Sequence, residues 1–335
     1  MKLSVIIPAY NVENYIEKCI LSVINNDLDH MAYEIIVIDD ESPDESVKVV
    51  KKMQKNYPHI KLLRQRNLGL GGARNTGIEN SFGKFIMFLD ADDYLKENKL
   101  QNIIDSAINN KLDILEFGAI GITEKGREIY KYSKATSTIV SGFEYLDKTS
   151  YMDSACNKLY SVSFLKKHKL RFKERIFIED FEFNTRAFYY SKRVKAVDDI
   201  LGYFVQTSNS ITRNSDNKKN SKMVIDIEGV IDLTLKFQQE ESNFNSRDTK
   251  VFKERIAFLT ISLLFNLIKL SINEKQYKLI MKNLKIKKLY PVKTSIKNKN
   301  KNLFRWVVNN EFLFFQLFRC NKIIHNKLRE LKVIL

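Results

Sequence analysis

Short apolar runs alternate with segments of helical periodicity along the first part of the chain. The apolar runs are rich in isoleucine and valine and predict strands at 3–10, 33–38, 60–64, 84–89 and 113–118. Between them, the spacing of apolar residues predicts helices at 13–26, 44–57, 71–81 and 96–110. Strands and helices that alternate with short connections predict an α/β fold, with a mostly parallel sheet and helices on both of its faces.

The alternation weakens toward the middle of the chain. Residues 124–140 predict a loose hairpin, and the segments expected after it are helices at 143–148 and 181–190 and an extended stretch at 195–205. From residue 214 onward the chain turns helical and basic, with helices expected near 222–239, 250–271 and 274–284. We therefore predict an α/β domain over residues 1–213 and a mostly helical, basic C-terminal region over residues 214–335.

Three acidic residues, Asp90, Asp92 and Asp93, follow the fourth predicted strand at once. Carboxylates this close repel one another, and a cation offsets the repulsion where a strand end is buried. Mg²⁺ and Mn²⁺ prefer carboxylate oxygens and are commonly shared with substrate phosphates. One interpretation is therefore a site for a metal and a diphosphate. The other is an acidic turn that caps the next helix, because acidic side chains suit helix N-termini.

Other polar clusters also lie where predicted strands end. Residues 8–11 follow the first strand, Asp39 and Asp40 the second, and a glycine-rich loop at 67–74 the third. Ligands of parallel sheets bind outside the carboxyl ends of the strands. Because all these clusters converge on that edge, we expect the functional site there.

These clusters and their order carry a resemblance to a known family. The blocks are SVIIPAYN at 4–11, VIDDES at 37–42, NLGLGGARNTG at 67–77, LDADD at 89–93, NKLY at 157–160 and ED at 179–180. Together they resemble glycosyltransferase family 2, whose members have the GT-A fold, and Ser210-Ile211-Thr212 resembles the end of its catalytic region. The resemblance implies a catalytic domain over 1–213, with a nucleotide-binding half at 1–95 and an acceptor half at 96–213.

The resemblance implies a pocket for a UDP-sugar. Tyr10 would offer an aromatic face to the base, and Asp39 would accept a hydrogen bond from a ring N–H, which favours uracil; a plain strand-ending turn is the alternative for Tyr10. Asp40 could equally be structural. Arg74 can pair with acidic side chains or with phosphate. The nucleotide-sugar-binding residues implied are Pro8, Ala9, Tyr10, Asn11, Asp39, Asp40, Asn67, Gly72, Arg74, Asn75, Asp90, Ala91 and Asp92.

The resemblance also implies the catalytic groups. Asp92 would ligate Mn²⁺ or Mg²⁺, with Asp90 on the ribose or on metal-bound water. Asp180 would be the general base that takes the proton of an acceptor hydroxyl, and Glu179 would position the acceptor or raise the pKa of the base. On residues alone, the pattern favours Asp180 as a helix N-cap and Glu179 as an ordinary acidic neighbour. Cys156 departs from the tryptophan of many relatives, which puts acceptor contacts in doubt.

Charge is distributed unevenly. The net charge is +16, and residues 213–335 hold 26 Lys and Arg against 11 Asp and Glu. Basic residues interleaved with aromatics predict that this region meets an anionic membrane surface; a helical cap on the catalytic domain and a composition bias of the genome are the alternatives. No nucleic-acid-binding module accompanies the charge, so no nucleic acid is expected as a partner.

The first residues predict no secretion signal, and the apolar runs predict no helix that spans a membrane. Three widely spaced cysteines suit a reducing compartment. We therefore expect a cytoplasmic enzyme, peripheral on the inner face of the cell membrane. It would be an inverting transferase that moves a sugar from a UDP-sugar to a glycan or lipid-linked acceptor in capsule, exopolysaccharide or cell-surface glycan synthesis. The alternatives are an inactive membrane-associated scaffold and a nucleotidyltransferase. The sequence leaves the sugar, the acceptor and the oligomeric state open.

Overall fold

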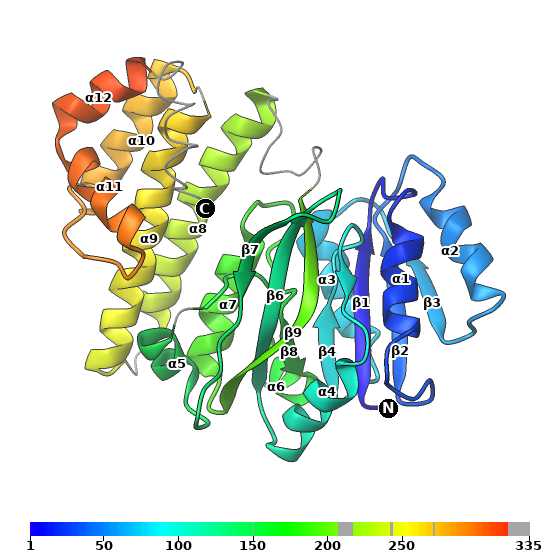
Figure 1. Cartoon of the computed structure of the whole chain (residues 1–335). Helices are drawn as coiled ribbons and strands as arrows, with labels where there is room; N and C mark the ends of the chain where they lie inside the picture. Colours follow the sequence, from blue (N-terminus) through cyan, green and yellow to red (C-terminus); the bar gives the residue numbers. More distant parts are fainter. Residues whose placement is uncertain (150, 207–216, 242–243, 271, 321–335) are drawn as a thin grey trace. The chain divides into compact units, whose positions relative to one another are not determined.

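The computed structural model describes residues 1–149, 151–206, 217–241, 244–270 and 272–320 (Figure 1). The chain divides into two compact units, residues 1–210 and 211–335. The first unit is built on one mixed sheet, and the second consists of helices. The predicted Ser210-Ile211-Thr212 block lies outside the described residues.

The sheet of the first unit has nine strands in the order β3-β2-β1-β4-β8-β6-β9-β5, with β7 paired to β6. They are β1 (Leu3–Ala9), β2 (Tyr33–Asp39), β3 (Ile60–Arg64), β4 (Phe85–Phe88), β5 (Tyr94–Leu95), β6 (Ile114–Thr123), β7 (Glu128–Tyr132), β8 (Lys158–Ser161) and β9 (Val194–Gln206). Strands β3, β2, β1 and β4 are parallel throughout, whereas β8 runs antiparallel to both of its neighbours. The predicted hairpin at 124–140 forms between β6 and β7.

Helices cover both faces of the sheet, as the pattern predicts (Figure 1). On one face Leu3, Val5 and Ile7 of β1 share a core with α1 (Ile16–Ile24), α2 (Ser46–Gln54) and α4 (Leu100–Asn109). On the other, Ile6 meets α3 (Gly69–Glu79) so closely that a Cβ on Gly77 would stand 2.3 Å from it. Successive side chains of a strand point to opposite faces. Both faces of β1 are buried, and its residues are apolar except for Ser4, whose hydroxyl donates to Glu34.

Three further helices belong to this unit: α5 (Gly142–Lys148), α6 (Val162–Lys167) and α7 (Glu179–Tyr190). The sequence pattern predicted α5 and α7 but neither β8 nor α6. Strand β8 is only four residues long and buries a lysine, Lys158, so it lacks the apolar run that marks the other strands.

The second unit contains α8 (Asn217–Glu240), α9 (Ser246–Lys269), α10 (Glu274–Ile286), α11 (Lys299–Asn309) and α12 (Glu311–Arg319). Asparagine caps four of them: Asn245, Asn273, Asn298 and Asn310 each accept a hydrogen bond from the backbone N–H three residues on. Helix α9 is the core helix that its apolar run predicted. Within the described ranges, no helix has the length and apolar character needed to cross a membrane.

Candidate active site

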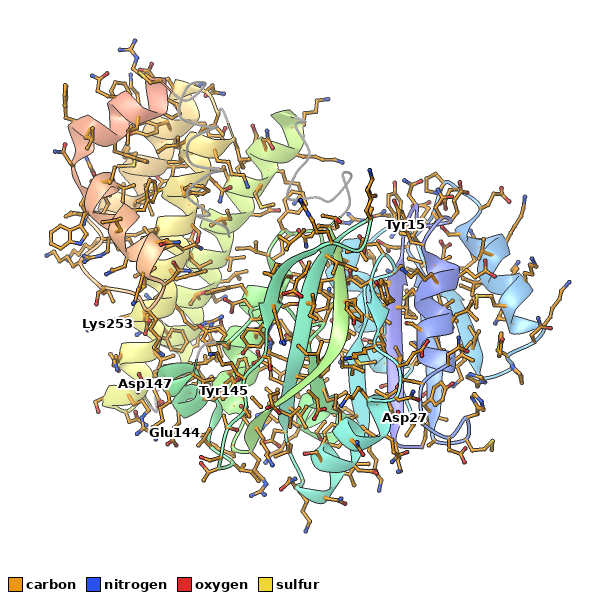
Figure 2. The ribbon with its side chains drawn as sticks, viewed as in Figure 1. Tyr15, Asp27, Glu144, Tyr145, Asp147 and Lys253 are labelled. Carbon is orange, nitrogen blue, oxygen red and sulfur yellow. The ribbon has the colours of Figure 1, made fainter. Side chains whose placement is uncertain are left out.

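The polar clusters converge at the carboxyl edge of the parallel strands. The register pairs Ala9 of β1 with Asp39 of β2, and Asp39 with Arg64 of β3, so these strands end side by side. Figure 2 labels Tyr15 at this end of the sheet and Asp27 at the opposite end. The edge therefore gathers residues from several loops, as parallel sheets do around their ligands.

A buried guanidinium is the centre of this edge. Arg74 of α3 is 1% exposed and donates from Nη1 to Glu179 Oε1 at 2.8 Å and to Asp180 Oδ1 at 2.5 Å. Its Nη2 donates to Asp90 Oδ1 at 3.0 Å and to Cys156 Sγ at 3.6 Å. Of the two partners that the sequence left open for Arg74, the structure shows the acidic side chains. Arg74 thus brings together carboxylates that are about ninety residues apart in the chain.

The carboxylate of Asp180 is held by Arg74 and a backbone N–H and does not cap α7. The N-cap of α7 is Ile178, with φ 57° and ψ 29°, and no side chain caps the helix. Asp180 instead accepts from Arg74 at Oδ1 and from the Ala155 N–H at Oδ2, at 2.8 Å, and its side chain stays 21% exposed. A β-branched residue in the left-handed region is strained, and such strain is typical of functional sites. The N-cap interpretation of Asp180 is therefore wrong.

Burial and mutual repulsion raise the pKa values of the carboxyl groups in this cluster. Burial raises the pKa of Glu179 to about 7, helped by the neighbouring Asp180 carboxylate and opposed by Arg74. Burial also raises the pKa of Asp180 above its usual range, and Arg74 limits that rise. A carboxylate with a raised pKa binds a proton more readily, which suits a general base.

Asp40 and Asn75 fix the glycine-rich loop. The Asp40 carboxylate is 4% exposed and accepts from Gln65 Nε2, the Leu68 N–H and the Gly69 N–H at 2.7–2.9 Å. Both polar atoms of the Asn75 side chain bond the backbone of Phe172, at 2.8 and 3.0 Å. These bonds are structural, so a contact of Asp40 or Asn75 with the donor stays a prediction.

Gly71 and Gly72, predicted in a glycine-rich loop, lie in the first turns of α3, and packing requires them there. A Cβ on Gly72 would stand 2.3 Å from the Leu68 side chain, and one on Gly71 would stand 2.2 Å from the Lys173 carbonyl. Asn67 lies in the same loop, where its side-chain oxygen accepts from the Gly69 N–H at 3.2 Å and its carbonyl from Arg175. The loop is thus built to seat α3 tightly, whatever ligand it meets.

The predicted base pocket combines one buried and two open residues. Asp39 is 1% exposed and accepts from the Ser42 N–H at 3.1 Å and from Arg64 Nε at 3.0 Å. Tyr10 is 52% exposed beyond the end of β1, and Asn11 follows it with φ 57°. Pro8 and Ala9 are the last residues of β1. An exposed ring beside a buried carboxylate gives the edge both a stacking surface and an acceptor.

Comparisons with known proteins show the family and the fold class of this chain. Residues 4–169 match the family model of glycosyl transferase family 2. This part of the chain belongs to glycosyl transferase family 2. The uncharacterized glycosyltransferase EpsJ of Bacillus subtilis is 32% identical over 216 residues, which cover 62% of each chain. The Staphylococcus aureus poly(ribitol-phosphate) beta-N-acetylglucosaminyltransferase TarP is 29% identical over 196 residues, 56% of this chain and 59% of TarP.

A glycosyltransferase of Streptococcus pneumoniae, GlyA, is 30% identical over 223 residues, 63% of this chain but 32% of GlyA. The chain thus spans less than two thirds of the length of these curated relatives. Among solved structures, S. aureus TarS 1-349 in complex with UDP-GlcNAc has a TM-score of 0.65 at 19% identity, over 98% of this chain and 92% of that one. This likeness confirms the predicted α/β fold class with its helical C-terminal region.

The acidic run of this family 2 domain carries negative charge that is only partly offset. Burial and the neighbouring Asp90 raise the pKa of Asp92 to about 6, and no lysine or arginine of the described residues pairs with Asp92. Asp93 is 8% exposed and accepts from the Val205 N–H at 2.7 Å. Asp90 and Asp92 therefore form a hard oxygen donor set whose charge a divalent cation would offset.

That donor set is incomplete by itself. In the part of the chain that the structure describes, no three His, Cys, Asp or Glu side chains are grouped to hold a metal ion. Mg²⁺ is often held by one or two carboxylates together with substrate phosphates. The residues present fit a metal that arrives with a diphosphate better than one bound permanently.

Sequence reasoning gave no role to the buried network behind Asp180. Lys158 is fully buried, and its ammonium donates to the carbonyls of Met152 and Ser154 at 2.6 and 2.7 Å and to Asn157 Oδ1 at 2.8 Å. Glu116 accepts from the Met152 N–H at 3.1 Å and from the Tyr145 hydroxyl of α5 at 2.8 Å (Figure 2). The network fixes the loop whose Ala155 N–H binds Asp180. The NKLY block was the only sequence signal for it.

Proposed function

We propose that this chain is an inverting glycosyltransferase that moves a sugar from a UDP-sugar to a hydroxyl of a glycan. The observation that carries the proposal is the cluster of Asp90, Glu179 and Asp180 around buried Arg74, because it sets an acidic strand end beside a partly exposed carboxylate. Membership in glycosyl transferase family 2 and the fold shared with a UDP-GlcNAc-bound protein support the same reading.

The nucleotide is assigned to the carboxyl edge of β1 and β2. Tyr10 offers its exposed ring to the base, and Asp39 accepts from the ring N–H. The diphosphate then lies toward Asp90 and Asp92. A divalent cation bound there would neutralise the charge of the departing diphosphate. We propose Mn²⁺ or Mg²⁺, held by Asp92 and Asp90.

Asp180 is the general base of the proposed reaction. It takes the proton of the acceptor hydroxyl as that oxygen forms a bond to the anomeric carbon, while the bond from that carbon to the diphosphate breaks and UDP leaves. Arg74 and the Ala155 N–H hold the carboxylate in place for this step. Glu179 shares the guanidinium of Arg74 with Asp180, so Arg74 neutralises the Asp180 carboxylate only in part. A positioned base is typically worth about 10²–10⁴-fold in rate.

The acceptor is proposed to be a cell-surface glycan or its lipid-linked precursor. Two relatives support this: TarP and a Bacillus spizizenii protein are named for transfer to poly(ribitol-phosphate). Capsule or exopolysaccharide synthesis is one setting for such a reaction. The site of action would then be the inner face of the cell membrane, where lipid-linked acceptors lie.

A donor-binding and hydrolysis experiment tests the proposal. Thermal unfolding is measured with UDP-GlcNAc, UDP-glucose, GDP-mannose or NAD, each with and without Mn²⁺, and UDP release is followed in parallel. We expect UDP-sugars to stabilise the protein only with the metal, and Asp92→Asn to abolish that shift. Asp180→Asn should lower turnover by at least about 10²-fold and leave the shift intact.

The matched control is Asp27→Asn, an exposed aspartate at the opposite end of the sheet (Figure 2). It should leave both signals unchanged. Near-normal turnover in Asp180→Asn would remove that residue from its role. Donor binding without any turnover in the parent protein, with a range of glycan acceptors, would favour the inactive scaffold instead.

A further inference from the structure

A hollow of about 680 Å³ lies between α10 and α12, within the second unit. Its floor and walls are mostly apolar, and its rim is mostly basic. The lining residues are Tyr277, Lys278, Met281, Lys282, Lys285, Ile286, Glu311, Phe312 and Phe315. Nothing in the proposed sugar transfer uses this surface.

Large apolar side chains stand exposed around the hollow. Phe312 is 74% exposed and Ile286 is 69% exposed. Of the twelve exposed large apolar side chains of the described residues, six belong to helices α10–α12: Leu279, Ile286, Leu303, Trp306, Phe312 and Leu313. Single exposed apolar residues need no explanation, but Ile286 and Phe312 both line the hollow, and apolar side chains exposed together there mark an interaction surface.

The charge beside these apolar residues is positive. Lys278, Lys282 and Lys285 follow one face of α10 at intervals of four and three residues. Lys278 pairs with exposed Glu274, and Lys285 with exposed Glu311. Such solvent-exposed pairs are weak and exchange readily with other anions. Lys282 has no carboxylate partner among the described residues.

The floor of the hollow is rigid. The Tyr277 ring stacks on Phe318 at 4.3 Å between centroids and meets Phe315 at 5.5 Å. Phe314 is fully buried beneath them. Phe312 and Ile286 are therefore presented to solvent on a packed aromatic base, where burying them on a partner costs little ordering entropy.

We propose that the α10–α12 hollow, with its lysine rim, is the surface by which this protein binds an anionic phospholipid bilayer. Phe312 and Ile286 enter the headgroup and acyl boundary, and the lysines meet the lipid phosphates. Apolar and basic side chains lie next to each other around the hollow. A bilayer surface likewise places phosphates next to acyl chains, so both kinds of side chain find a partner there. A free phosphate would leave the apolar residues uncovered, and a second protein would need its own acidic rim.

This inference rests on the membrane setting of the proposed function and names the surface responsible for it. It does not depend on the donor, the metal or Asp180. Sugar transfer to a water-soluble acceptor and binding to vesicles can therefore fail separately.

The test is co-sedimentation of the full chain with vesicles of phosphatidylcholine alone or with about 30% phosphatidylglycerol. We expect binding only to the anionic vesicles, and its loss in about 0.5 M salt. A lysine near an anionic surface contributes about 1 kcal/mol, a factor of about five. Lys278→Gln with Lys282→Gln should thus lower the partition coefficient about 30-fold, and Phe312→Ser about tenfold.

Two matched controls separate this surface from general charge and apolarity. Lys51→Gln with Lys52→Gln removes the same charge from exposed positions of α2, and Ile225→Ser removes a 57% exposed apolar residue from α8. Both should bind like the parent protein, and circular dichroism should show all variants folded. Unchanged binding in the Lys278→Gln, Lys282→Gln variant and in Phe312→Ser would overturn the proposal. The interaction would then be assigned to another basic stretch, such as residues 321–335. No binding by the parent protein would overturn it as well.

Discussion

Replacing Arg74 with glutamine removes a positive charge that three carboxylates share. The guanidinium makes charged hydrogen bonds to Asp90, Glu179 and Asp180, each worth about 1.5–3 kcal/mol taken alone. The three do not add, because burying Arg74 has its own desolvation cost and its Nε has no hydrogen-bond partner. Breaking a buried ion pair costs about 3–5 kcal/mol, and we expect Arg74→Gln to lower the free energy of unfolding by about 4 kcal/mol.

For a domain of this size, 1 kcal/mol shifts the melting temperature by about 2–4 °C, so the expected loss is about 8–16 °C. The assay is thermal unfolding at pH 8 and at pH 5.5. Arg74 opposes the rise in pKa of Glu179 and Asp180, so its removal raises both values further. At pH 5.5 more of these carboxyls are protonated and repel less, and the loss should be smaller there than at pH 8.

Arg127→Gln is the matched control, because Arg127 is exposed in the turn between β6 and β7. It should shift the melting temperature by less than about 1 °C. Arg74→Lys should recover part of the loss, since it restores the charge but not the fork that reaches three carboxylates. A loss below about 1 kcal/mol, or one equally large at both pH values, would refute this account of the cluster.

Two further predictions concern the neighbours of Asp180. The raised pKa of Glu179, about 7, means that the folded state holds its proton more tightly than the unfolded chain, so parent stability falls as pH rises from about 5 through 7. Glu179→Gln should flatten that part of the stability profile, and a profile as steep as the parent's would contradict the assignment. Lys158→Met should lower kcat about tenfold or more with little change in the donor KM, because the loop that bonds Asp180 loses its anchor. Lys166→Met, an exposed lysine of α6, is the control; a change confined to stability would reduce Lys158 to a structural role.

The parallel half of the fold could be predicted from the sequence because its signals are local. Strand β3 has the predicted bounds, and β1, β2 and β4 differ by a residue or two at their ends. Strand β8 could not be predicted, because it buries Lys158. The carbonyls of Met152 and Ser154 and the Asn157 side chain make that burial tolerable by accepting from its ammonium. Helices α11 and α12 were missed as well. Lysines and asparagines interrupt the apolar period of α11, and α12 is only nine residues long.

Some residues of the candidate site could be predicted from local sequence signals, and others could not. Asp90 and Asp92 are visible in the sequence because they follow an apolar run directly. Asp180 needs the resemblance, since an acidic residue at a helix start is ordinary and nothing local reveals its bond to the Ala155 N–H. Two partners of Arg74, Glu179 and Asp180, lie about ninety positions after the third partner, Asp90. No rule of sequence spacing predicts a contact over that distance.

The fit of α3 against residues 172–175 limits how such enzymes can be recombined. Asn75 bonds both backbone groups of Phe172, and Gly71 admits the Lys173 carbonyl where any larger residue would collide. A chimaera that joins this chain's first ninety-five residues to the remainder of a relative would break this contact. When parts are exchanged between relatives, α3 and residues 172–175 should therefore be taken from the same protein.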